Sequence, residues 1–109
     1  MNSNTGINKV FLLGHVKNEP RRHKNPNSAD TLCFKLVTRE NYRKGDSVTA
    51  HEEYHDLVIC TDNSDVKDIP LKAGSLLHVT GKIQTKNWVD NDKIRRYKTE
   101  IHVLQLQLV

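Results

Sequence analysis

Several features are scarce in this sequence, and their scarcity excludes whole classes of protein. Its two cysteines, Cys33 and Cys60, lie in apolar runs without CxxC spacing, which favours buried free thiols over a disulfide or a metal pair. No run approaches the ~20 apolar residues of a membrane span, and residues 1–6 have neither the charge nor the apolar core of a signal peptide. We therefore expect a soluble protein of the cytoplasm with no membrane partner.

Glycine is sparse as well, and the five glycines form no motif for binding phosphate or for activating a nucleophile. They are scattered rather than grouped as GxGxxG or GxxxxGK, and the sequence contains no GxSxG. A protein without these motifs is better interpreted as a binding module than as an enzyme. We expect no catalytic residue and no cofactor.

One segment nevertheless matches a metal site. His51–His55 reads HEEYH, the HExxH spacing with which a helix presents two histidines to zinc. The run from Tyr54 to Cys60 is β-branched and aromatic, which favours a strand, and positions four apart in a strand lie roughly 13 Å from each other. Two nitrogens at that separation cannot both ligate one zinc ion, so we expect no metal site here.

The chain is long enough for one domain, and it is basic. It has 109 residues, a formal net charge of +4 and a sequence pI of about 9.2. A chain of this size buries roughly 60–70% of the surface that its unfolded form exposes, so it needs no disulfide or metal to fold. The charge is compatible with a polyanionic partner. We expect a single domain over residues 1–109.

Apolar patterning predicts an all-β fold with one short helix. Residues 7–16 have apolar side chains at both odd and even positions, as in a central strand that is buried on both faces. Residues 17–30 are interpreted as an exposed loop or a loose hairpin. Cap residues followed by spaced apolar residues predict a helix of two turns at most between Thr61 and Ser75, because Pro70 interrupts it. The predicted strands are residues 7–16, 32–42 and 53–60 and the two arms of a hairpin over 76–103, whose second arm continues through a bulge at 103–104 into the tail.

The resulting order is β-β-β-α-β-β. This order is typical of the OB-fold, a five-stranded Greek-key barrel whose open face and loops bind oligonucleotides. A turn at Gly45-Asp46 joins the second and third predicted strands.

The hairpin from Leu76 to Val103 contains the strongest candidate for a binding surface. Alternation puts the only tryptophan, Trp88, on the face opposite Leu77 and Val79. Single-stranded nucleic acid exposes base faces that stack on aromatic rings, while cationic side chains contact its phosphates. The alternative for Trp88 is a partly buried core indole. The basic residues that flank it in sequence are Lys82, Lys86, Arg95, Arg96 and Lys98.

Other aromatic and basic residues extend this set. Tyr42 and Tyr54 are candidate stacking rings, with ordinary packing on the barrel surface as the alternative for both. Tyr97 shares parity with two apolar residues of the last strand, so we expect it in the core. Each basic residue is either a phosphate contact or solvated surface. Besides those named above, they are Lys35, Arg39 and the loop residues Arg21, Arg22, His23 and Lys24.

Several segments closely resemble the bacterial single-stranded DNA-binding proteins. They are the opening INKVFLLGHV, the central EYHDLV, the turn KAGS and, most specifically, GKIQTKNWVD with RRYKTEIHV. The resemblance spans residues 7 to about 108. It implies non-sequence-specific binding and protection of single-stranded DNA in replication, recombination and repair. Residues expected to bind DNA are Lys9, Lys35, Arg39, Tyr42, Tyr54, Lys82, Lys86, Trp88, Arg95, Arg96 and Lys98.

Departures from the family pattern qualify this inference. The family's stacking tryptophans fall on Tyr42, Tyr54 and Trp88, so two of them are replaced by a smaller ring. Cys60 stands where the family usually has a stacking phenylalanine. The lower aromatic content implies weaker binding per base.

The resemblance also implies a homo-oligomer, with a tetramer favoured over a dimer. His55 matches a histidine that helps to hold subunits together in the family, although Asp56 replaces the more usual basic neighbour. Many relatives carry an acidic tail that recruits replication proteins, and we expect none here. The alternative is an SSB-like primosomal replication protein, a dimeric OB-fold adaptor bridging DNA and partner proteins. A tetramer with high affinity for oligo-dT favours the first interpretation, whereas a dimer with weak DNA binding and a protein partner favours the second.

Overall fold

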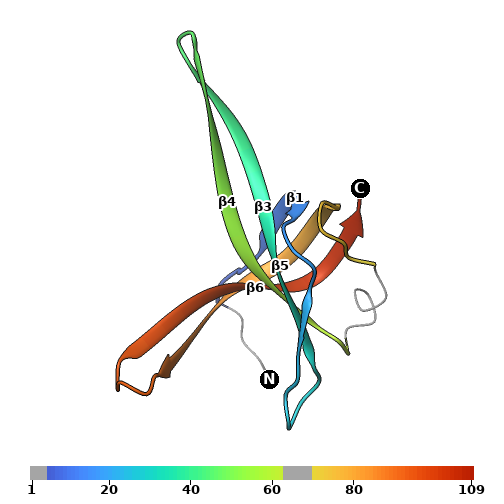
Figure 1. Ribbon diagram of the computed structural model, residues 1–109, viewed down its shortest axis with the longest axis vertical. Coiled ribbons are helices and arrows are strands. Elements are labelled where there is room, and N and C mark those ends of the chain that lie inside the picture. The colour runs from blue at the N-terminus through green and yellow to red at the C-terminus, as the bar shows by residue number, and fades with distance from the viewer. Residues whose placement is uncertain (1–4, 63–69) are drawn as a thin grey trace.

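The computed structural model describes residues 5–62 and 70–109, which form six strands (Figure 1). The strands are β1 (Val10–Val16), β2 (Arg21–His23), β3 (Thr31–Lys44), β4 (Ser47–Cys60), β5 (Leu76–Val89) and β6 (Arg95–Leu108). No helix occurs among the described residues. The predicted short helix is not borne out, and residues 63–69, which make up most of it, lie outside the described residues. The described residues also contain no helix long and apolar enough to cross a membrane.

The strands form one sheet that closes into the predicted OB-fold barrel. Their order is β1-β5-β6-β4-β3-β2, and an additional pairing of β1 with β3 closes the barrel. β1 pairs with β5 as far as His15↔Leu76, and its last two residues pair with Val37 and Leu36 of β3. Residues 21–23, predicted as loop or loose hairpin, form the short β2, which pairs with the beginning of β3.

The inner faces of the five barrel strands supply the core. Leu36, Ile59, Leu77 and Val79 are completely shielded from solvent. Each comes from a strand in which alternate residues are apolar, as a sheet with one buried face requires. The complete core cluster is Val16, Phe34, Leu36, Leu57, Ile59, Leu77, Val79, Ile101, Val103 and Leu106.

Two long hairpins extend from this barrel (Figure 1). β3 and β4 remain paired to Lys44↔Ser47, and Gly45 takes a positive φ of 62° in the predicted Gly-Asp turn. Residues 43–44 and 47–52, predicted to lie outside the strands, belong to them. The β5–β6 hairpin pairs out to Val89↔Arg95. Its register steps from Thr80↔Gln105 to Gly81↔Val103, which makes Leu104 the inserted residue of a β-bulge, close to the position that the sequence predicted.

One face of β1 differs from the prediction. The strand lies centrally, between β5 and β3, as expected, but it is not buried on both sides. Phe11 is 64% exposed and Leu13 is 55% exposed. The barrel covers only the inward-facing residues of β1, so its outward-facing residues remain open to solvent.

Candidate nucleic-acid interface

Trp88 lies on an open face of the β5–β6 hairpin. It is 43% exposed and faces Arg96 directly across the two strands. Lys86, two residues earlier on the same face, places its ammonium nitrogen 5.9 Å from the indole ring centroid. The indole is therefore an accessible ring beside cations, and the partly buried alternative does not describe it.

The turn of this hairpin fixes Arg96 beside the ring. The Asp90 carboxylate accepts hydrogen bonds from the backbone N–H groups of Asp92 and Ile94, both at 2.9 Å, and from the Arg96 side chain at 2.8 Å. These hydrogen bonds hold the pKa of Asp90 below its ordinary value, and the bond from the Ile94 N–H contributes most, ahead of the bond from Arg96. Arg96 is thus oriented before any ligand arrives.

Glu100 is a buried carboxylate beneath the basic side chains. It is 6% exposed and lies 3.4 Å from the Lys86 nitrogen, 3.9 Å from that of Lys98 and 3.6 Å from a ring nitrogen of His102. Lys86 and Lys98 face each other across the strands, an arrangement in which like charges repel. Glu100 offsets this repulsion and holds both lysines on the Trp88 face. This role of Glu100 was not predicted from the sequence, although strand alternation places Glu100 on the same face as Lys98.

A groove of about 510 Å³ continues this basic surface onto the barrel. Its lining includes four cationic and two acidic side chains, and Lys35 forms an ion pair with Asp56 at 2.9 Å. A second groove, of about 370 Å³, shares Lys98 and Glu100 with the first and adds Lys86. The two grooves therefore meet on one face. The charged residues of the first groove are Lys17, Arg21, Lys35, Asp56, Lys98 and Glu100.

Tyr54 lies beside the first groove. It is half exposed, its hydroxyl donates to Glu52, and the Lys17 ammonium lies 6.0 Å from its ring centroid. Lys17 was not singled out from the sequence, because only its position after β1 brings it to this ring. Arg39 shares the Tyr54 face of β3–β4 and lies 3.6 Å from Glu52.

Tyr42 belongs to a different surface. It faces Thr49, whereas Tyr54 faces Val37, so the two rings project from opposite faces of the β3–β4 hairpin. Its hydroxyl donates to Glu40 at 2.8 Å, a bond that raises the pKa of Tyr42 above its ordinary value. The structure therefore connects Tyr54 to the first groove through Lys17 and Trp88 to the second through Lys86, whereas Tyr42 lies on the opposite face of its hairpin.

Both cysteine thiols are free, but they are less buried than predicted. Cys33 is partly buried and Cys60 is exposed. The Cys60 thiol donates to Asp62 at 2.7 Å, which raises its pKa. Cys60 falls at the end of β4, beyond the barrel core, which explains why an apolar run did not bury it.

The remaining predicted residues divide between two faces. Lys82 shares the Trp88 face, and the Lys9 ammonium lies 6.0 Å from the exposed Phe11 ring. Arg95 projects from the opposite face of the β5–β6 hairpin and donates to Asn87 at 2.6 Å. Tyr97 shares that opposite face and is 67% exposed, so its predicted place in the core is wrong. Its strand has left the barrel at this point, and no second layer of described residues covers it.

The whole HExxH segment lies within strand β4, whereas the predicted strand began only at residue 53. His51 contacts Glu53 at 2.9 Å, and His55 shares a hydrogen bond with the Thr38 hydroxyl at 2.9 Å. No group of three potential metal-ligating side chains occurs within residues 5–62 and 70–109.

Comparison with known proteins gives consistent matches. The model of the single-strand binding protein family matches residues 7–109. The chain is 30% identical over 106 residues to single-stranded DNA-binding protein 1 of Chlorobaculum tepidum, covering 95% of this chain and 65% of that protein. The chain thus spans about 65% of the length of this curated relative.

Two solved structures have a similar fold. A Plasmodium falciparum SSB in complex with single-stranded DNA superposes with a TM-score of 0.81 at 27% identity, over 100% of this chain and 99% of that chain. A deletion mutant of the single-stranded DNA binding protein from Thermus aquaticus gives a TM-score of 0.78 over 95% of this chain and 51% of that chain. At 17% identity, the second match shows the fold alone.

Proposed function

Because the chain belongs to the single-strand binding protein family, we propose that it binds single-stranded DNA without sequence preference and protects it during replication, recombination and repair. The observation that carries this proposal is the exposed Trp88 ring among Lys86, Arg96 and Lys98. Bases stack on the ring, and the cations contact the phosphates on either side. Such a protein acts as a binding protein in the bacterial cytoplasm, at the nucleoid.

The two grooves suggest a path for the strand. From Trp88 the phosphates pass Lys86 and Lys98, and then reach Lys35 and the Tyr54 ring through the groove on the barrel. Stacking requires unpaired bases, because the faces of paired bases are hidden in a duplex. This surface therefore recognises that the bases are unpaired, and it does not read their sequence.

Titration with oligo-dT tests the proposal. Trp88 is the only tryptophan, so stacking on it should quench the intrinsic tryptophan fluorescence of the protein. Affinity should fall as salt rises, with a log–log slope of about 0.7 for each phosphate neutralised. Duplex DNA of equal length serves as the control and should bind more weakly. Equal affinity for duplex and single strand, or no quenching at low salt, would contradict the proposal.

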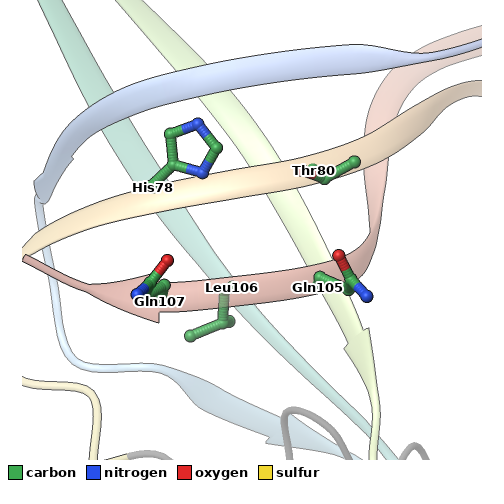
Figure 2. A pocket seen from close by; sticks show the side chains of 5 residues that line it. All are labelled: His78, Thr80, Gln105, Leu106 and Gln107. Atoms are coloured by element: carbon green, nitrogen blue, oxygen red, sulfur yellow. The ribbon is translucent and has the colours of Figure 1, made fainter.

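We further propose that the protein forms a homo-oligomer, with a tetramer expected, through the outer face of β1 and β5. Phe11 and Leu13 are exposed there, whereas single large apolar side chains on a monomer are usually scattered. A hollow with a mostly polar lining lies on β5 and β6 (Figure 2). His78, Gln105 and Gln107 project from one side of the sheet there, and Leu106 is directed to the other side. A second copy that covers this face would remove two large apolar side chains from water.

Replacing Phe11 by lysine should lower the solution mass at micromolar concentration toward that of the monomer, because the added charge would be buried without a partner. Val48→Lys is the matched control, since Val48 is 61% exposed at the tip of the β3–β4 hairpin and carries the same added charge. Light scattering or sedimentation measures the mass. An unchanged mass for the Phe11 variant would exclude this face as the interface.

A further inference from the structure

The reverse face of the β5–β6 hairpin, opposite Trp88, carries the most exposed of the described Phe, Tyr and Trp side chains. Tyr97 is 67% exposed, compared with 43% for Trp88. It faces Asn87 across the strands, one residue from the Trp88↔Arg96 pair. Because neighbouring residues in a strand point to opposite faces, the hairpin presents one large ring on each side.

The surroundings of Tyr97 suit a nucleic acid. Arg95 lies two residues earlier on the same face, and its guanidinium is held by the Asn87 side chain at 2.6 Å. The described residues of this face include no carboxylate, so its only formal charge is positive. Its residues are Ile83, Thr85, Asn87, Val89, Arg95, Tyr97 and Thr99.

The contrast with Tyr42 shows what this charge distribution means. Tyr42 is also about half exposed, but its hydroxyl bonds to Glu40 and its pKa is raised by that carboxylate and by Glu53. Phosphates approaching Tyr42 meet Glu40 and Glu53 besides Lys44, whereas phosphates approaching Tyr97 meet Arg95 and no carboxylate. Tyr97 is therefore the better placed of the two rings for a polyanion.

We propose that Tyr97 and Arg95 form a second base-stacking position, for a nucleotide of a single strand that passes around the edge of the hairpin from Trp88. Among the described residues, β5 and β6 pair only with each other over residues 84–89 and 95–100, so a strand can reach both faces. One base stacks on Tyr97 and the adjacent phosphate contacts Arg95. This inference rests on the proposed binding of single-stranded DNA and adds a second position to it.

A fluorescent reporter at position 97 tests the inference directly. In the double variant Trp88→Phe, Tyr97→Trp, the only tryptophan reports on the reverse face, while the phenylalanine introduced at position 88 would still offer a ring on the first. Oligo-dT of about 4 to 16 bases covers the range bound by one OB-fold. The reporter should be quenched by the longer oligonucleotides and not by the shortest, whereas Trp88 of the unmodified protein should be quenched by both.

Single substitutions give an independent measurement. Tyr97→Ala should weaken binding of the longer oligo-dT by about fivefold, the lower end of the effect of losing one stacking ring, and leave the shortest unaffected. Tyr97→Phe keeps the ring and should bind normally. Tyr42→Ala is the matched control for loss of an exposed tyrosine and should have the smaller effect.

The outcomes separate this inference from the proposed function. If Trp88 is quenched in the unmodified protein but the reporter at position 97 is not quenched at any length, the second position is excluded and single-strand binding stands. If neither is quenched, both proposals fail. A change in solution mass of Tyr97→Ala without DNA would show that Tyr97, with Val89 nearby, contacts another protein chain, and would also overturn the inference.

Discussion

Replacing Trp88 by alanine should weaken binding of oligo-dT by about 1–3 kcal/mol, or roughly 5- to 150-fold, and leave the fold intact. The indole is accessible, and Lys86, whose ammonium lies 5.9 Å from the ring centroid, is held by its contact with Glu100. Truncation removes the stacking surface but not the phosphate contacts. The residual binding should therefore keep nearly the same dependence on salt.

The measurement requires a labelled oligonucleotide, because the variant contains no tryptophan. Fluorescence anisotropy gives the affinity, and circular dichroism with a thermal melt reports on the fold. Trp88→Phe is the control that retains an aromatic face and should lose less affinity than Trp88→Ala. Unchanged affinity in the alanine variant would remove Trp88 from the binding site, and loss of the fold would indicate a structural role.

The parts of the fold that follow from local pattern were predictable from the sequence. Alternation identified Leu77 and Val79 as core residues, and the Gly45-Asp46 pair predicted the turn that joins β3 and β4. The parity change near Leu104 predicted a bulge because period-two alternation cannot otherwise be interrupted in a barrel strand. The same alternation put Trp88 and Lys86 on one face of their hairpin.

Alternation gives the face of a residue but not what covers that face. Tyr97 has the parity of the core residues Ile101 and Val103, yet it lies where the hairpin has left the barrel. Phe11 shows the reverse case, an apolar residue in a central strand whose outer face is open. These differences depend on pairings between distant segments, which a single strand does not encode.

The candidate site shows the same limit. Tyr42 and Tyr54 were both candidate stacking rings in the sequence, but the register of β3 with β4 directs them to opposite faces. Glu100 is also recognisable only in three dimensions, because its three basic neighbours combine its own strand with the facing one. Charge and aromatic content therefore led to the proposed class of ligand, and the strand register determines which of these residues share a face.

Replacing Gly14 by alanine should have a large effect on the stability of the fold. It is buried where β1 turns from β5 to β3, immediately before the residues that close the barrel. A Cβ at this position would lie 3.0 Å from the carbonyl carbon of Val37, closer still to its oxygen, and 3.2 Å from the Leu36 side chain. Since the main obstacle is backbone, Gly14→Ala should force β1 and β3 apart and lower the free energy of unfolding by about 1–3 kcal/mol.

Urea denaturation measures this loss as a lower midpoint with an unchanged slope. Gly6→Ala is the matched control, because a Cβ there meets no atom within 4 Å and should leave the midpoint in place. Gly14 has no positive φ, so the requirement for glycine comes from the close approach of two strands and not from its backbone conformation. If β1 and β3 could separate without cost, alanine would be tolerated at position 14 nearly as well as at position 6. Equal midpoints for the two variants would therefore contradict the close-approach explanation. If only Gly14→Ala lowers the midpoint, and it still binds oligo-dT with unchanged affinity below the unfolding transition, then Gly14 is needed for closure of the barrel and not for binding.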